Sequence, residues 1–230
     1  MSGYWVIVGA TTLVGWLISS RLKSKFKKYS QIPTGSGKSG ADIAREMLAY
    51  YDISDVQIVQ GQGSLTDHYN PAKKTISLSP EVYQGRHVSA AAVAAHECGH
   101  AVQHAEAYAM LQVRSALVPV VNVSSKMQQY LFMGAIFGGA VLGGFGGQIL
   151  LLALVVTFGL TALFSIITLP VEFDASKRAL NWLDNSGNTH GMEYEGAKDA
   201  LWWAAMTYVA AALGALVMFL YFAMQLMNRN

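Results

Sequence analysis

The sequence predicts a mainly helical membrane protein, in which four transmembrane helices accompany one small domain of helices and strands. Hydrophobic residues make up 53% of the 230 residues and charged residues only 13%, a composition too apolar for a soluble protein of this size. Long apolar runs account for the transmembrane helices. Two short runs with a period near two, placed before an alanine-rich helical stretch, predict a sheet of two or three strands.

The first transmembrane helix is predicted over residues 4–20, which form an apolar run without a charged side chain. Basic residues follow at once from Arg21, whereas a cleaved signal peptide would carry its positive charges before the apolar run. The run is therefore expected to remain as an anchor. Because positively charged flanks stay on the cytoplasmic side, we expect the amino terminus outside and the chain from Arg21 onward inside.

A small cytoplasmic domain is predicted between this anchor and the next apolar run. Residues 40–51 have apolar side chains at helical spacing, and the runs 56–59 and 75–78 are predicted strands. The stretch between them, 65–74, contains Asn-Pro and two lysines and is predicted to form a turn. Extended peptides pair with exposed sheet edges, so this sheet is a candidate for holding a substrate. Its polar candidates are Asp67, His68 and Tyr69.

Three further apolar runs complete the predicted membrane part. They cover residues 131–144, 149–169 and 201–227, and the glycine-rich stretch 143–147 is predicted to turn the first two into a hairpin. With both termini outside, fifteen of the sixteen Lys and Arg residues lie inside, Arg229 being the exception. The predicted divisions are an anchor (1–20), a cytoplasmic domain (21–126), a transmembrane hairpin (127–171), a cytoplasmic helix and loop (172–199) and a transmembrane helix (200–230).

The alanine-rich stretch 91–100 contains the pattern HExxH. On a helix, His96 and His100 lie about 40° apart around the axis and about 6 Å apart along it, so one metal ion can reach both. Glu97 lies one step round the helix, close enough to hold a metal-bound water without ligating the metal. The alternative is a pair of core histidines with a chance glutamate beside them. A buried glutamate is costly without a partner, which favours the zinc site.

A third ligand is expected where the run 149–169 ends, on the same inner side as the two histidines. Pro170 suits the first turn of a new helix or a kink, and Glu172 would then emerge at the inner membrane face. Two histidines and one carboxylate leave a position for water, which is typical of catalytic zinc. Asp174 is the alternative ligand, although it points to the opposite face of the helix. Glu172 is also explained as an acidic residue favoured near a helix start.

Two other residues of the motif helix are not expected to bind the metal. Cys98 is about 200° round the helix from His96 and is expected to be a small buried filler. His104 lies about 12 Å along the axis from His96, too far to share one ion, and is expected at the edge of a cleft.

These features resemble the membrane-bound zinc metallopeptidases of the YugP-like kind, also called zinc peptidase family 2. The resemblance extends over nearly the whole chain and includes the stretches 65–71, 94–103, 169–180 and 207–210. It implies a multi-pass protein of the bacterial plasma membrane with peptidase activity.

A more distant similarity is to integral-membrane peptidases of the HtpX and CAAX-processing type. In those, the resemblance implies a glutamate ligand after a pair of spans and an aspartate four residues beyond it that supports the first histidine. Ser176 occupies that position here, so Asp174 or a hydroxyl is expected to take the supporting role.

The predicted function is zinc-dependent hydrolysis of peptide bonds at the cytoplasmic membrane face. Glu97 would remove a proton from the zinc-bound water as it attacks the carbonyl and would pass that proton to the leaving amine. Either His190 or Tyr69 is a candidate to stabilise the developing oxyanion, although His190 also fits a plain surface loop.

Two other functions fit the same motif. One is an intramembrane, site-2-like protease, although the polar residues His104 and Glu106 at the end of the motif helix suit lipid poorly. The other is a non-catalytic membrane scaffold that binds metal, which would have no need of Glu97. The expected partners are a peptide or membrane-protein substrate and the lipid bilayer. Basic residues gather near apolar segments rather than spreading over a surface, so no nucleic-acid partner is expected.

Overall fold

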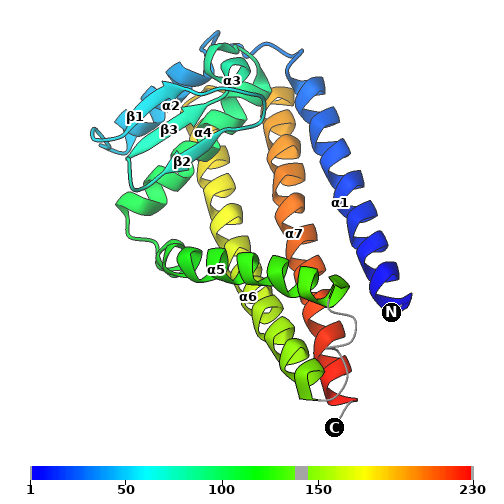
Figure 1. The fold of residues 1–230 in the computed structure, drawn as a ribbon. Coiled ribbons are helices and arrows are strands. Elements are labelled where there is room, and N and C mark those ends of the chain that lie inside the picture. Colours follow the sequence, from blue (N-terminus) through cyan, green and yellow to red (C-terminus); the bar gives the residue numbers. More distant parts are fainter. Residues whose placement is uncertain (1, 138–144, 229–230) are drawn as a thin grey trace. The chain divides into compact units, whose positions relative to one another are not determined.

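The computed structural model describes residues 2–137 and 145–228, which form a mainly helical chain with one small sheet (Figure 1). Both features confirm the predicted mainly helical class and the predicted small sheet. The helices are α1 (Ser2–Tyr29), α2 (Gly40–Tyr50), α3 (Pro80–Gln84), α4 (Val88–Ala105), α5 (Ala109–Phe137), α6 (Phe145–Asn185) and α7 (Met192–Met227). The strands are β1 (Gln57–Gln60), β2 (His68–Asn70) and β3 (Thr75–Leu78).

The chain divides into two compact units. Unit 1 contains Met1–Leu17, Val113–Leu169 and Thr207–Asn230. Unit 2 contains Ile18–Gln112 and Pro170–Met206. The HExxH stretch and Glu172 therefore belong to the same unit, although the apolar segments of unit 1 separate them in the sequence.

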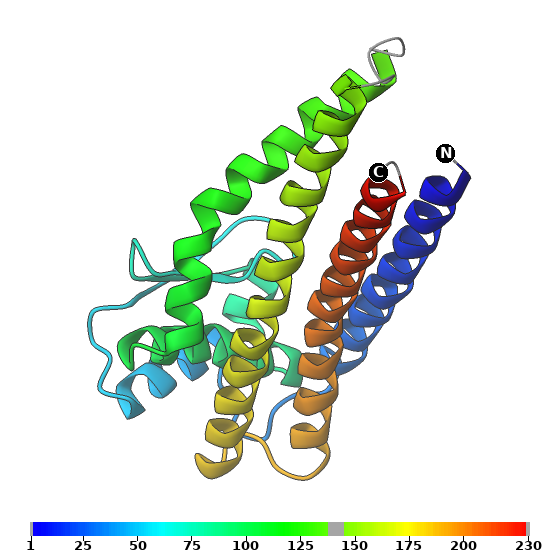
Figure 2. The same cartoon turned by 90° about the horizontal axis from the view of Figure 1, so that it is seen from below.

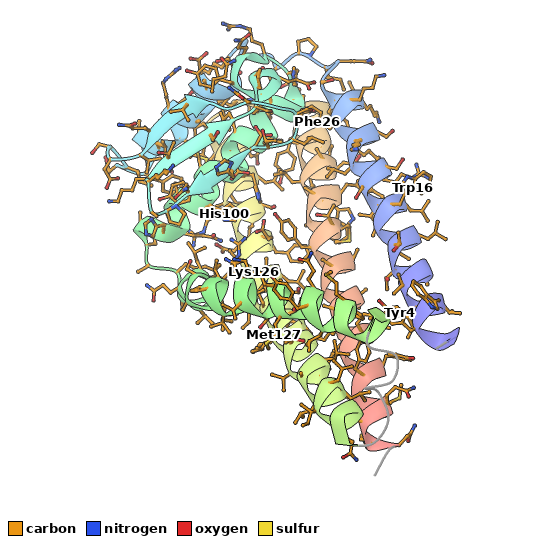
Figure 3. All side chains as sticks on the ribbon, viewed as in Figure 1. Tyr4, Trp16, Phe26, His100, Lys126 and Met127 are labelled. Carbon is orange, nitrogen blue, oxygen red and sulfur yellow. The ribbon has the colours of Figure 1, made fainter. Side chains whose placement is uncertain are left out.

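Unit 1 consists of parts of the four long helices α1, α5, α6 and α7. Figure 2 shows the carboxy-terminal part of α7 beside the amino-terminal part of α1. There the Tyr4 ring lies 6.4 Å from the Tyr221 ring and 6.2 Å from the Phe222 ring, measured between centroids. Large apolar side chains also point outward. Trp16, which Figure 3 labels, is an example and is 63% exposed. Such an apolar exterior is typical of a surface that contacts lipid.

Three helices in the described ranges are long and apolar enough to cross a membrane: Gly3–Tyr29, Gly146–Asn185 and Met192–Met227. They correspond to the first, third and fourth predicted spans. The remaining predicted span, 131–144, begins within α5, and its residues 138–144 lie outside the described ranges. The predicted break at 143–147 is wrong for its last three residues, because α6 already begins at Phe145.

The long helices α6 and α7 also differ from the prediction around the predicted cytoplasmic segment. Pro170 lies inside α6, so no new helix begins there, and α6 continues to Asn185. The last helix, α7, begins at Met192, nine residues before the predicted start of its apolar run. Hydropathy marks only the apolar part of each helix, and both helices continue beyond that part with polar residues.

The sheet of unit 2 has the strand order β1-β3-β2, with β1 parallel and β2 antiparallel to β3. Side chains alternate along β3, so Ile76 and Leu78 are fully buried. The helices α2 and α4 pack together behind the sheet in Figure 1. The predicted turn 65–74 is wrong for residues 68–70, which form β2, because a strand of three residues shows too little alternation to be recognised.

Local sequence signals determine where the short helices of unit 2 begin. The Ser39 hydroxyl accepts a hydrogen bond from the Asp42 backbone N–H, and the Asp42 carboxylate accepts one from the Ser39 backbone N–H. Pro80 lies in the first turn of α3, where a backbone N–H is not needed. At the start of α4, Nδ1 of His87 accepts a hydrogen bond from Ala90 N–H. The motif helix therefore begins at Val88.

A close backbone contact joins α4 to α6 beside the two histidines. Gly99 has no side chain, and a Cβ built on it would lie 2.5 Å from the carbonyl oxygen of Ala175. That distance is far below van der Waals contact, so only glycine allows the helices to approach this closely. The alanines of the motif helix, together with Gly99, let α4 pack deep inside unit 2.

Replacing Gly99 with alanine is expected to destabilise unit 2 and weaken metal binding. The better helix propensity of alanine would contribute about 1 kcal/mol of stability, but overpacking against rigid backbone costs about 1–3 kcal/mol, so the loss prevails. Thermal unfolding and zinc titration would measure the two effects. Gly15→Ala in α1 is the matched control, because its added Cβ meets nothing within 4 Å. Equal melting temperatures for Gly99→Ala and the control would contradict this account.

Candidate metal centre

Three side chains from two helices of unit 2 converge at one point. Successive turns of α4 supply His96 and His100, and α6 supplies Glu172. Oε2 of Glu172 lies 3.4 Å from Nε2 of His96 and 3.5 Å from Nε2 of His100. All three candidate ligand atoms lie within 4.8 Å of one another. The structure thus brings together the three residues that the sequence predicts as metal ligands, and Figure 3 labels His100 among them.

The spacing of these atoms fits a zinc ion. Zinc bonds to imidazole nitrogen and carboxylate oxygen are about 2.0–2.2 Å long, so atoms at two corners of a tetrahedron around zinc are about 3.4 Å apart. The two nitrogen-to-oxygen distances, 3.4 Å and 3.5 Å, agree with that value. Two imidazoles and one carboxylate would leave the fourth corner for water, as in catalytic zinc sites.

Burial makes the electrostatics of this cluster favourable to a cation. Glu172 is only 1% exposed, and His100 is also buried. Burial alone would lower the pKa of His100, but the hydrogen bond and the negative charge of Glu172 outweigh it and raise that pKa above its ordinary value. The surroundings therefore stabilise positive charge at the His100 imidazole, and a divalent ion would supply it.

Each imidazole has a hydrogen-bonding partner at its other ring nitrogen, Nδ1. The hydroxyl Oγ of Ser176 lies 3.1 Å from Nδ1 of His96, and Oε1 of Gln103 lies 3.0 Å from Nδ1 of His100. A hydrogen bond at Nδ1 fixes the ring orientation and leaves Nε2 for a metal. The supporting group expected as Asp174 or a hydroxyl is therefore the hydroxyl of Ser176.

Glu97 lies on α4 directly after the first histidine of the cluster. Glu97 is buried, with only 8% of its surface exposed. Within residues 2–137 and 145–228, its carboxylate makes no hydrogen bond or ion pair. The carboxylate is therefore available to bind water. A buried carboxylate without a hydrogen-bonding partner in the protein is costly for stability, and active sites sustain costs of this kind.

The two other candidates near the motif do not contribute ligand atoms. The Asp174 carboxylate accepts hydrogen bonds from Nε2 of Gln103 at 2.8 Å and from Nε of Arg178 at 2.5 Å. Cys98 is fully buried with Sγ 3.5 Å from the carbonyl oxygen of Ala44, and burial raises the pKa of its thiol well above the ordinary value. It is therefore a neutral filler, as predicted.

The two oxyanion candidates lie in other parts of unit 2. The Tyr69 hydroxyl in β2 lies 2.7 Å from Nδ1 of His104, near the end of α4. His190 is exposed on the turn between α6 and α7, and the backbone of that turn donates hydrogen bonds to the carbonyl of Leu183. Leu183 is eleven residues along α6 from Glu172, or about 16 Å. The oxyanion roles expected for Tyr69 and His190 stay predictions.

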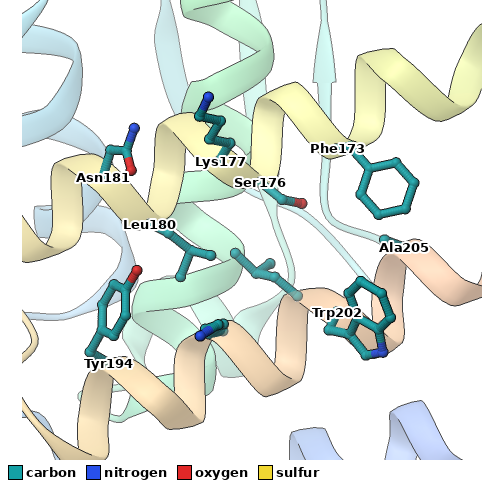
Figure 4. A pocket seen from close by; sticks show the side chains of 10 residues that line it. Phe173, Ser176, Lys177, Leu180, Asn181, Tyr194, Trp202 and Ala205 are labelled. Carbon is teal, nitrogen blue, oxygen red and sulfur yellow. The ribbon is translucent and has the colours of Figure 1, made fainter.

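A groove between α6 and α7 borders the cluster on the side of Ser176. It has a volume of about 260 Å³, and Figure 4 shows Phe173 and Trp202 at one end and Asn181 and Tyr194 at the other. The rings of Phe173 and Trp202 lie 6.3 Å apart, measured between centroids. The lining is mostly apolar, so the groove suits apolar side chains.

Sequence reasoning did not assign a role to Gln103. Its signal was its position three residues after His100 on the same helix, which places the two side chains on one face. A glutamine at this spacing is usually an ordinary polar residue. Only its burial in the structure distinguishes Gln103 from such a residue.

Replacing Ser176 with alanine is expected to weaken zinc binding about 10-fold, the lower end of what losing an outer partner of a ligand costs. The reason is that His96 loses the group that orients its ring. Competition with a chelator of known affinity would measure the change. The neighbouring exposed residue Lys177 supplies a control, Lys177→Ala, which should bind zinc like the wild type. If both variants bind zinc equally well, Ser176 does not orient the ring.

Comparison with known proteins adds two matches that cover most of the chain. Residues 4–227 match the family described as "Putative neutral zinc metallopeptidase". The chain is also 41% identical over 209 residues to the "Putative membrane protease YugP" of Bacillus subtilis (strain 168), covering 90% of this chain and 89% of that protein. No solved structure matches the chain.

Proposed function

This chain belongs to the family described as "Putative neutral zinc metallopeptidase", and we propose that it is a membrane-bound zinc endopeptidase acting at the cytoplasmic face of a bacterial plasma membrane. The observation that carries the proposal is the convergence of His96, His100 and Glu172, with Glu97 beside them. The ligand set fits zinc, and the unligated carboxylate is the group that a hydrolase needs in addition.

The membrane face is proposed from the charge pattern of the sequence. Basic residues follow directly after the first apolar run, and positively charged flanks favour the cytoplasmic side. Glu172 comes three residues after the end of the apolar run 149–169, so the site would lie close to the inner surface of the bilayer. Substrates would then be peptides or membrane-protein segments near that surface.

The chemistry assigns one proton-transfer role to this chain. A bound zinc ion would supply a Lewis acid that acidifies water and polarises the substrate carbonyl. The Glu97 carboxylate accepts a proton from the attacking water and then, as a carboxylic acid, donates it to the nitrogen of the leaving amine. Nδ1 of each imidazole is already hydrogen-bonded, so Nε2 of His96 and Nε2 of His100 would hold the ion.

Substrate positioning is proposed at the outer edge of β2. This strand pairs with β3 on one side only, so its other edge is open within the described residues. β2 also packs against the motif helix α4, and the Tyr69 hydroxyl of β2 lies 2.7 Å from Nδ1 of His104, one turn beyond His100. An extended peptide could add to this edge through backbone hydrogen bonds, and the groove beside Ser176 would accept an apolar side chain.

Removal of the metal tests the proposal directly. The protein, purified in detergent, is expected to cleave casein or a membrane-protein substrate, to stop after chelation, and to resume when zinc is returned. Cleavage that continues in a metal-free sample would contradict the proposal. A protein that binds zinc at full occupancy but cleaves no substrate would instead favour a metal-binding scaffold.

A further inference from the structure

Gln103 is a buried polar side chain whose every hydrogen-bonding atom has a partner. It is 0% exposed, and it lies on α4 three residues after His100. Its Nε2 donates to the carbonyl oxygen of Val171 and to the carboxylate of Asp174, both at 2.8 Å. Its Oε1 lies 3.0 Å from Nδ1 of His100. A buried amide with this full set of bonds is held in one orientation.

The partners of Gln103 decide which way its amide faces. Val171 offers a carbonyl oxygen and Asp174 a carboxylate oxygen, and neither can donate a proton. The two N–H groups of the amide must therefore point to them, which leaves the amide oxygen facing His100. An oxygen can only accept, so Nδ1 of His100 must carry the proton. Nε2, which lies 3.5 Å from Oε2 of Glu172, is then the ring nitrogen left to bind a metal.

We propose that Gln103 is a positioning residue that selects the metal-binding tautomer of His100, and that Asp174 selects the orientation of Gln103. The inference rests on the proposed function, since it concerns the same zinc site. It extends that function by assigning roles to two residues that do not touch the metal. It also explains why Asp174, an acidic residue two positions after Glu172, does not serve as a ligand itself.

Asp174 is in turn held by a charged partner. Oδ2 of Asp174 accepts from Nε of Arg178 at 2.5 Å, and Nη1 of Arg178 donates to Glu106 at 2.6 Å. Glu106 caps the carboxyl end of α4, so this chain of contacts joins α4 to α6 beyond the cluster. The arginine lies between two carboxylates and keeps the Asp174 oxygen available as an acceptor for Gln103.

Two variants of similar size separate tautomer selection from simple packing. Gln103→Glu keeps an oxygen that can accept from His100 but places a second carboxylate beside Asp174. Gln103→Met keeps the volume and has no good acceptor. If Gln103 acted by packing alone, methionine would be the better replacement, because burying a charge beside another like charge is unfavourable. If Gln103 selects the tautomer of His100, glutamate is the better replacement, because it keeps the accepting oxygen.

The experiment measures zinc affinity by chelator competition and the melting temperature of the metal-free protein, for the full chain in detergent. Gln103→Met is expected to weaken zinc binding about 10- to 100-fold, and Gln103→Glu less than that. The melting temperatures are expected in the opposite order, with Gln103→Glu the less stable. The double variant Gln103→Glu with Asp174→Asn should regain stability, since the new amide can donate to the new carboxylate, while keeping the zinc affinity of Gln103→Glu.

A matched control and two contrary outcomes make the test decisive. Gln112→Met changes an exposed glutamine in α5 whose Nε2 donates to the carbonyl of Ala107, and it should bind zinc like the wild type. If Gln103→Met binds zinc as tightly as the wild type, or as tightly as Gln103→Glu, the inference is overturned while the zinc site stands. If the wild type itself binds no zinc, the proposed function fails instead.

Discussion

Replacing Glu97 with glutamine is expected to abolish peptide-bond cleavage while zinc stays bound. Glutamine has nearly the same size as glutamate but cannot accept a proton from water, and loss of a general base typically costs about 10²- to 10⁴-fold in rate. The zinc ligands are unchanged, because Glu97 is not one of the three residues whose ligand atoms converge. The measurements are zinc content per chain and kcat/KM on a peptide substrate.

The interpretation of this variant depends on both readouts together. Zinc retained with cleavage lost supports a hydrolase in which Glu97 moves the proton. Equal cleavage by the wild type and Glu97→Gln would contradict that role. Glu195→Gln is a matched control, because Glu195 is an exposed glutamate on α7 that pairs with Lys198 at 3.7 Å. It should leave both quantities unchanged.

Replacing Glu172 with alanine is expected to lose zinc and, with it, all cleavage. The carboxylate is one of three protein ligands and is almost fully buried. Its loss should weaken zinc binding by more than the roughly 10- to 100-fold typical of losing an outer partner. Zinc content after dialysis against a weak chelator would measure this.

Asp174→Ala distinguishes a ligand from a supporting residue. It is expected to keep one zinc per chain, although with lower affinity, since Asp174 contacts Gln103 and Arg178 rather than the cluster. Thermal unfolding of the metal-free variants separates zinc loss from misfolding. Unchanged zinc content in Glu172→Ala would place the third ligand elsewhere.

The ligand cluster could be predicted because much of its geometry follows from residues that are close in the sequence. The four-residue spacing of His96 and His100 on an alanine-rich helix determines their relative position from helix geometry alone. Glu172 was found from its place at the end of an apolar run, with the resemblance in support. Residues 76 positions apart nevertheless had to meet, and only the structure shows that they do.

The supporting contacts could not be predicted from spacing. Gln103 was passed over because its role depends on Val171 and Asp174, which lie on another helix. His190 was chosen for its chemistry and lies on the turn after α6, so its role stays a prediction. In β2, tertiary pairing overrides a weak local pattern that contains Asn70 and Pro71 and favours a turn.

The contact of Gly99 with the backbone of Ala175 has a consequence for metal-free protein. Backbone packing, rather than the ion, determines how far α4 lies from α6, so the ligands are preorganised before any metal arrives. Structural zinc modules unfold without their ion, because binding and folding are one event in them. Here the apoprotein should keep its circular dichroism spectrum and the slow amide exchange of α4, and zinc should bind without a folding phase.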